Sequence, residues 1–217
     1  MSTPIKLVLL GCLAFSVAGA TTIAFTHYPT AQGSGTLNGF WTATVDGKTG
    51  VQLICDDYVH TSRTGVAYDS YQVSVLDGPN PLHNVRFSPP NQAQAYRAAA
   101  ILVSQLLGLG AGATAQQVTN YQYALWDLFT PSVPTNTTQD NLRTAAWDQA
   151  GANPTLALYS QLRVYTPDRT VYPITVDGRQ VNPQEFLGWA PVPEPSQFAG
   201  LLAVLGIGWF VRRRRMA

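Results

Sequence analysis

Cysteine is among the scarcest residues of this sequence, with two copies in 217 residues. Cys12 lies in an apolar run near the N-terminus, so Cys55 is the only cysteine in the region that follows. A single cysteine excludes a disulfide within one chain. A zinc site built from Cys55, Asp56 and His60 would have no second cysteine cluster and only three histidines in the chain to draw on. We therefore expect no metal site and no cofactor.

Charged side chains are also few, at 12% of the sequence. Between Thr21 and Pro191 there are 8 Lys and Arg against 11 Asp and Glu, a net charge of −3. No basic face indicates nucleic acid as a partner. Thr, Ser, Asn, Gln, Gly and aromatic residues are plentiful instead, a balance more typical of a secreted β-rich surface protein than of a cytosolic enzyme.

The N-terminal segment has the layout of a signal peptide. One lysine precedes an apolar run from Leu7 to Val17, and the small residues 18–20 have the form that signal peptidase accepts. We predict a signal peptide over residues 1–20, with cleavage after Ala20 and export of the rest. A lipidation site at Cys12 is the alternative, but apolar sequence continues past that residue.

The C-terminal segment, residues 191–217, combines a Pro-rich spacer, an apolar run and a basic end. The apolar run, Phe198 to Val211, is shorter than the roughly 17 to 25 residues of a comfortable membrane helix, so it would span thinly. The basic end would stop it on the cytoplasmic side. The membrane-stop residues are Arg212, Arg213, Arg214 and Arg215.

This order of features resembles the PEP-CTERM sorting signal, with Pro193, Glu194 and Pro195 as its tripeptide. The resemblance implies that an exosortase recognises the tripeptide. The protein would then be anchored transiently in the inner membrane by the C-terminal helix and released to the cell surface or the extracellular biofilm matrix. A plain membrane anchor is the alternative.

Residues 21–190 have the size of one domain. Asp46-Gly47 and Asp177-Gly178 separate alternating segments and predict β-hairpins, and Asp77-Gly78 predicts a further turn. None continues into the ligand ladder of a calcium-binding loop. The alternating segment 68–76 is the predicted partner of the strand that ends at Cys55, and the segment from Leu187 onward is predicted as a linker.

Helical patterns begin after Ser88. The first predicted helix ends near Gly108, and a second begins at a capping box of Thr114 and Gln117 and runs to about residue 129. A third spans about 139–150, and a short one follows Asn153. We predict an α+β fold, a β-sandwich or barrel-like sheet with a helical insertion, flanked by a signal peptide and a C-terminal membrane helix.

Two residues of this domain stand out chemically. On the strand that ends at Cys55, Leu53 and Cys55 share one face, so we expect the thiol to point inward. On the second predicted helix, Gln122 interrupts an apolar face that includes Val118 and Leu125. A buried carboxamide without hydrogen-bond partners costs about 1 to 3 kcal/mol. The simplest interpretation is a glutamine satisfied by neighbouring backbone.

The sequence YQYALW, residues 121–126, resembles the Thr-Gln-x-Ala-(Ile/Val/Leu)-Trp signature of bacterial thioester domains, with Tyr121 in place of the threonine. Residues 53–58 resemble the hydrophobic-Cys-x-Asp pattern found with such domains, with Ile54 where an aromatic is more common. The resemblance implies a surface adhesin module in which Cys55 and Gln122 form an internal thioester. Such a bond attaches the protein covalently to amine or hydroxyl targets.

The candidate supporting residues are Asp56, His60 and Trp126. Asp56, Asp57 and His60 are close enough to Cys55 in sequence to supply a proton acceptor. We expect Asp57 and His60 to be exposed loop residues, because exposure is the common state of charged side chains.

Three alternatives remain. The domain could have a thioester-domain fold without the bond. An enzyme could pair Cys55 with His60 or His83, but no glycine-flanked nucleophile motif supports catalysis, so we expect no enzyme. The chain could also be a non-covalent structural or carbohydrate-binding matrix protein with a buried free cysteine. Its target would be an extracellular polysaccharide or surface protein. The candidate sugar-stacking residues are Trp41, Trp126, Trp147 and Trp189.

Overall fold

The computed structural model describes residues 20–29, 31–33, 36–76, 82 and 84–190. The predicted sorting signal and all but the last residue of the predicted signal peptide lie outside these ranges. The first strand begins at Thr21, the residue after the predicted cleavage site. Within the described ranges, no helix has the length and apolarity needed to cross a membrane.

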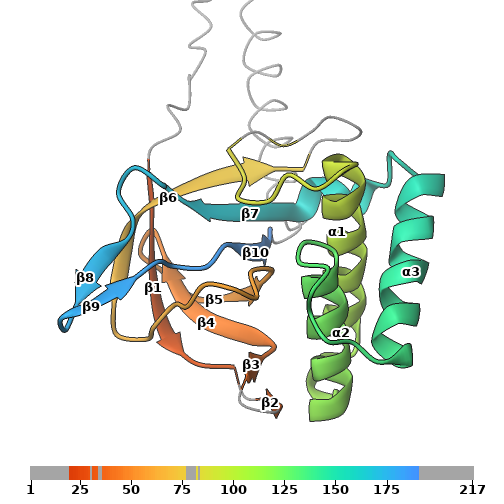
Figure 1. Ribbon diagram of the computed structural model, residues 1–217, viewed down its shortest axis with the longest axis horizontal. Coiled ribbons are helices and arrows are strands. Elements are labelled where there is room, and N and C mark those ends of the chain that lie inside the picture. Colours follow the sequence, from red (N-terminus) through yellow and green to blue (C-terminus); the bar gives the residue numbers. More distant parts are fainter. Residues whose placement is uncertain (1–19, 30, 34–35, 77–81, 83, 191–217) are drawn as a thin grey trace, which may run out of the picture.

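Six antiparallel strands close into a barrel in the order β1-β4-β5-β10-β7-β6 (Figure 1). The α+β, barrel-like prediction is therefore confirmed. The barrel strands are β1 (Thr21–His27), β4 (Phe40–Val45), β5 (Lys48–Cys55), β6 (Ala67–Val75), β7 (Leu162–Pro167) and β10 (Phe186–Trp189). Two small hairpins accompany it, β2 (Ala31–Gly33) with β3 (Thr36–Asn38) and β8 (Ile174–Val176) with β9 (Arg179–Val181).

Both predicted Asp-Gly hairpins are present, and the third predicted turn, Asp77-Gly78, lies outside the described residues. Asp46 and Gly47 have φ of 47° and 80° between β4 and β5, and Asp177 and Gly178 have φ of 49° and 73° between β8 and β9. Positive φ at both central residues is the requirement of the type I′ turn, which Asp-Gly meets at low cost.

Two predictions about the strands were wrong. β6, which contains most of segment 68–76, pairs with β1 and β7, whereas β5 pairs with β4 and β10. The predicted linker from Leu187 is instead part of β10, which joins β5 to β7. β10 was missed because a four-residue strand is too short to show an alternating pattern. The partner of β5 was predicted wrongly because barrel closure pairs strands that are distant in sequence, and local patterns do not indicate such pairings.

Three helices follow β6 in sequence, α1 (Gln92–Gly108), α2 (Ala115–Asp127) and α3 (Thr137–Ala152), with short 3₁₀ turns η1 (Gly110–Gly112) and η2 (Ala157–Gln161). The predicted capping box of Thr114 and Gln117 opens α2. α3 does not stop at Gly151 as predicted. A Cβ there would lie 2.8 Å from Nε2 of Gln94, which links α1 to α3 by donating to the Trp147 carbonyl oxygen.

The helices lie on one side of the barrel, with α1 between the barrel and α3 (Figure 1). This arrangement creates two apolar cores, one inside the barrel and one between the barrel and the helices. The barrel core includes the aromatic rings of Phe25, Trp41 and Phe186, with Phe25 and Phe186 centroids 4.6 Å apart.

Adjacent residues of β5 and β10 alternate between these cores. Cys55 and its cross-strand partner Phe186 belong to the barrel core, whereas Ile54 and its partner Leu187 pack toward the helices. Cys55 is the last residue of β5, so its thiol lies where the barrel core meets the loop that follows. The predicted inward orientation of Cys55 is confirmed.

We predict that Gly188→Ala destabilises the fold. A Cβ at this position of β10 would lie 2.7 Å from Cε2 of Tyr165 and 2.9 Å from Cδ2 of Leu53. Overpacking of this kind costs about 1 to 3 kcal/mol, measurable by urea unfolding. The control is Gly108→Ala in α1, where a Cβ meets nothing within 4 Å. Equal losses in the two variants would contradict the close approach at Gly188.

Candidate functional site: a buried cysteine and glutamine

The Cys55 side chain is enclosed by the loop that follows it. Its exposed fraction is 2%, and its thiol donates a hydrogen bond to the carbonyl oxygen of Asp57 at 3.0 Å. The Asp57 N–H in turn donates to the sulfur at 3.2 Å. The chain therefore turns around the sulfur and fixes its position by two main-chain contacts of one residue.

Gln122 lies in α2, 1% exposed, and both ends of its carboxamide bind main chain. The Gly39 N–H donates to Oε1 at 3.2 Å, and Nε2 donates to the carbonyl oxygen of Cys55 at 2.6 Å. The prediction of a buried glutamine satisfied by backbone is confirmed. One of the two partners is the cysteine residue itself, 67 positions away in sequence.

Gly39 is a site residue that no pattern in the sequence indicated. Its φ of +105° is a conformation that side chains rarely adopt, and a Cβ would lie 2.8 Å from Cγ1 of Val118 in α2. The glycine thus serves two purposes. It lets the chain turn into β4 with its N–H directed at Gln122, and it lets α2 approach closely enough for that bond to form.

Asp57 is fully buried, so the prediction of an exposed loop residue was wrong. Its carboxylate binds Arg86 Nη1 at 2.5 Å and His60 Nδ1 at 2.8 Å, and it also accepts the His60 N–H at 3.1 Å. The His60 side chain is 29% exposed, so it is only partly exposed and not the fully exposed loop residue that was predicted. The charge of Asp57 tolerates burial because Arg86, which lies far along the chain, is brought against it.

The Trp126 side chain is 4% exposed and packs with two tyrosine rings, Tyr58 at 5.1 Å and Tyr123 at 5.2 Å between centroids. Among the described residues, its Nε1 has no hydrogen-bond partner of ordinary geometry. Trp126 nevertheless acts on the Cys55 thiol and lowers its pKa. Because Gln122 and Trp126 are four residues apart in α2, they share one helix face.

Burial raises the pKa of the Cys55 thiol well above its ordinary value, and the carboxylates of Asp57 and Asp56 raise it further. The backbone of Asp57 and the side chain of Trp126 oppose this rise. The thiol is therefore protonated at rest. Any reaction of the sulfur as a nucleophile requires that a neighbouring group accept its proton.

Asp56 is fully buried, beside the equally buried Glu185. Burial and the carboxylates of Glu185 and Asp57 raise the pKa of Asp56 well above the usual range, so it holds a proton rather than accepting one in the resting state. Glu185 itself was not selected from the sequence. Its position in the chain, 130 residues from Cys55, gave no signal of this proximity.

The four candidate sugar-stacking tryptophans do not form one surface. Trp41 lies inside the barrel and Trp126 in the aromatic cluster, so both are buried and neither ring is open to a sugar. Trp147 packs against the helical core. Trp189 lines a groove of about 550 Å³ together with Phe40 and Tyr165.

Of the two alternative partners for a cysteine nucleophile, the structure describes His60. His83 lies outside the described residues. The imidazole of His60 binds the Asp57 carboxylate, and β5 ends at Cys55, so His60 belongs to the loop. In the part of the chain that the structure describes, no cluster of three or more His, Cys, Asp and Glu side chains could hold a metal ion.

We predict that Arg86→Met lowers the free energy of unfolding by about 3 to 5 kcal/mol, because it leaves the buried Asp57 carboxylate without its cation. Urea unfolding measures this loss. The matched control is Arg143→Met, which removes the more exposed ion pair of Arg143 with Asp127 and should cost at most about 1 kcal/mol. A small loss in both variants would show that Arg86 does not compensate Asp57.

No protein-family model matches this sequence, and no curated protein matches it. Two solved structures are similar to the chain. The N-terminal thioester domain of a surface protein from Clostridium perfringens is 15% identical, with a TM-score of 0.42, over 77% of this chain and 97% of that one. The N-terminal domain of the Streptococcus pyogenes pilus tip adhesin Cpa is 14% identical, with a TM-score of 0.40, over 88% and 100%.

Proposed function

We propose that this chain is an exported surface or biofilm-matrix protein whose Cys55 and Gln122 form an internal thioester for covalent attachment to amine or hydroxyl targets. One observation carries the proposal. The buried carboxamide of Gln122 is bound to the main chain of the residue that bears the only thiol between Thr21 and Pro191.

The contacts of Gln122 suit its role as the electrophile. A neutral amide reacts poorly with a thiol unless its carbonyl is polarised and held in place. The Gly39 N–H binds Oε1, which is the oxygen that gains negative charge when the carbonyl carbon is attacked. A fixed backbone donor at that oxygen is the arrangement that stabilises such charge in acyl transfer.

The reaction balances without a cofactor. The sulfur of Cys55 forms a bond to Cδ of Gln122, and the bond between Cδ and Nε2 breaks. The thiol proton is transferred to the departing nitrogen, so one molecule of ammonia is released. A target amine or hydroxyl then attacks the thioester carbonyl carbon, forms an amide or ester, and returns a proton to the sulfur.

Burial protects the bond. Cys55 and Gln122 are 2% and 1% exposed, so bulk water has little access to a thioester between them. Tyr58, Tyr123 and Trp126 form an aromatic cluster whose members flank both residues in sequence. A reactive bond is useful only if a target reaches it before water does. We infer that this cluster limits access until a target binds.

Export and processing belong to the same proposal. Signal peptidase would remove residues 1–20, and an exosortase would act at Pro193, Glu194 and Pro195. Residues 198–211 and the arginines that follow would anchor the chain in the inner membrane before that step. The target would be an extracellular polysaccharide or a surface protein, and the protein itself would not be an enzyme.

A second candidate function is non-covalent glycan binding, favoured by the groove at Trp189. Its walls combine the aromatic residues Phe40, Tyr165 and Trp189 with polar side chains that include Lys48 and Gln52. Aromatic rings beside hydrogen-bonding groups suit the apolar faces and hydroxyls of a sugar. In this case Cys55 would be a buried free thiol.

We predict that the unreduced protein has an intact mass lower than the encoded mass by one ammonia. Methylamine should add to this form at Gln122 and free the Cys55 thiol. Cys55→Ala and Gln122→Ala should each show the full mass of their own sequence and no adduct. The control Gln116→Ala changes an exposed glutamine of the same helix and should still lose ammonia. A full encoded mass with Cys55 titrating as a free thiol in every preparation would reject the thioester.

The same Cys55→Ala variant separates the two candidate functions. Covalent attachment predicts that retention on extracellular polysaccharide in denaturant is lost with Cys55. Glycan binding at the groove predicts reversible retention that survives Cys55→Ala and is lost in Trp189→Ala. Retention in a column binding assay, before and after a denaturing wash, measures both.

A further inference from the structure

Asp56 and Glu185 form a pair of carboxyl groups at the point where β5 ends and β10 begins. Phe186 of β10 pairs with Cys55 of β5 in antiparallel register, and continuing this register by one residue places Glu185 opposite Asp56. Both side chains are 0% exposed. Glu185 is the only glutamate between Thr21 and Pro191. Two carboxylates facing each other away from water repel strongly, so the pair is stable only with a proton between them.

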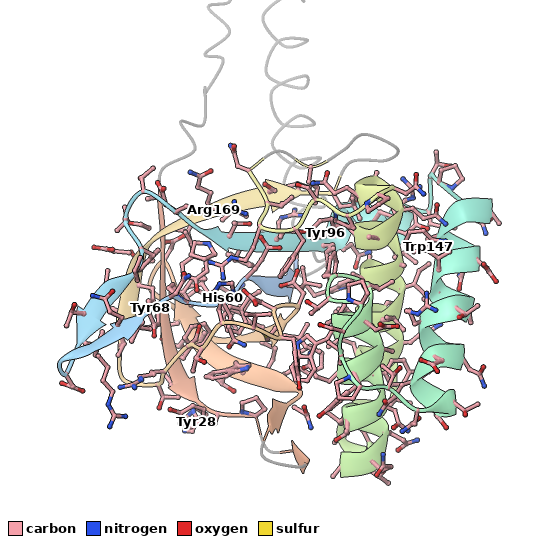
Figure 2. All side chains as sticks on the ribbon, viewed as in Figure 1. Tyr28, His60, Tyr68, Tyr96, Trp147 and Arg169 are labelled. Atoms are coloured by element: carbon pink, nitrogen blue, oxygen red, sulfur yellow. The ribbon has the colours of Figure 1, made fainter. Side chains whose placement is uncertain are left out.

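The hydrogen bonds around the pair are unequal. Glu185 accepts from the Tyr96 hydroxyl at 2.6 Å, from the Arg86 N–H at 2.7 Å and from the Thr166 hydroxyl. Tyr96 lies at the boundary between α1 and the barrel (Figure 2). The two carboxyl oxygens of Asp56, by contrast, accept no hydrogen bond of ordinary geometry within the described ranges. The hydrogen-bond donors therefore stabilise the ionised form of Glu185, whereas none of them stabilises the ionised form of Asp56.

This difference in hydrogen bonding indicates which of the two carboxyl groups holds the shared proton. The pKa of Asp56 is raised well above its usual range, first by burial and then by the charges of Glu185 and Asp57. Burial raises the pKa of Glu185 too, but its bonds to Thr166, Tyr96 and the Arg86 backbone oppose the rise. Asp56 is therefore the acid of the pair and Glu185 the carboxylate.

The pair lies next to the reacting groups along the main chain. Asp56 directly follows Cys55, and a negative charge on Asp56, when it is ionised, raises the pKa of the thiol. The nitrogen that Gln122 would lose, Nε2, is bonded at 2.6 Å to the carbonyl oxygen of the peptide that joins Cys55 to Asp56. Asp57 is less suited to carry a proton, because Arg86 and His60 already bind its carboxylate.

We propose that Asp56 and Glu185 act together as the proton carrier for thioester formation at Cys55, an inference that rests on the proposed function. As the sulfur bonds to Cδ of Gln122, the thiol proton passes to the pair. As the bond from Cδ to Nε2 breaks, the proton of Asp56 goes to the nitrogen and ammonia leaves. The pair ends with the single proton it began with.

The inference also accounts for a cost in the fold. Burying a carboxyl group beside a second carboxyl group lowers stability, so the position of Asp56 calls for an explanation. Full hydrogen bonding would fix its proton in place. An acid that is buried beside a bound carboxylate, but not bonded tightly itself, can donate and regain a proton within one reaction.

The test follows intact mass during cell-free synthesis of the full chain. Wild type should lose one ammonia soon after it folds. Asp56→Asn and Glu185→Gln should do so about 100-fold more slowly, the usual scale of general acid–base catalysis. Asp127→Asn, a carboxyl group paired with Arg143 at the end of α2, should match wild type. The rate should depend on pH in wild type and lose that dependence in Asp56→Asn.

Folding is checked separately. Asp56→Asn has nearly the shape of the protonated acid, so it should fold. The raised pKa of Asp56 means that its contribution to wild-type stability is present at low pH and lost as pH rises through that pKa. The free energy of unfolding of Asp56→Asn, measured in urea, should not show this fall as the pH rises. The groups that face the pair and also titrate or carry charge are Cys55, Asp57, Arg86 and Tyr96.

The outcomes separate the two proposals. If folded wild type keeps its full encoded mass, the thioester itself is rejected and the proton carrier with it. If wild type loses ammonia while Asp56→Asn and Glu185→Gln lose it at the wild-type rate with the same pH profile, only the proton carrier is overturned. Slow loss in both folded variants, with Asp127→Asn unchanged, supports it.

Discussion

The two hydrogen bonds of the Gln122 carboxamide join the helical layer to the barrel at the point on which the proposed chemistry depends. One bond reaches the Gly39 N–H where the chain enters β4, and the other reaches the Cys55 carbonyl at the end of β5. A buried polar group is stable only when its partners are in place. The register of α2 against the barrel is therefore tied to the position of the thiol.

Burial then sets the electrostatics around this contact. The carboxyl groups of Asp56, Asp57 and Glu185 are all 0% exposed within a few residues of Cys55 or its cross-strand partner. Each is compensated differently, Asp57 by Arg86, Glu185 by neutral donors and Asp56 by a proton. This arrangement keeps a protonated carboxyl group near the Cys55 thiol and excludes water from it. A thiol, an amide and a proton carrier in one dry region suit acyl transfer.

Local patterns in the sequence predicted the parts of this arrangement that depend on local physics. The Asp-Gly turns, the capping box of α2, the inward Cys55 and the buried Gln122 follow from turn geometry and periodicity. The strand at residues 186–189, the burial of Asp57 and the roles of Gly39, Arg86 and Glu185 did not. These depend on barrel closure, which brings together residues as far apart in sequence as Leu53 and Gly188, and a single sequence carries no signal for such pairings.

Proteolytic mapping of the unreduced protein by mass spectrometry tests the central claim most directly. The account predicts one cross-linked species in which the peptide of Cys55 is joined to the peptide of Gln122, with a mass one ammonia below their sum. It also predicts that hydroxylamine separates the two. Recovery of the two peptides as separate species, with a free Cys55 thiol and an intact Gln122 carboxamide, would contradict the account.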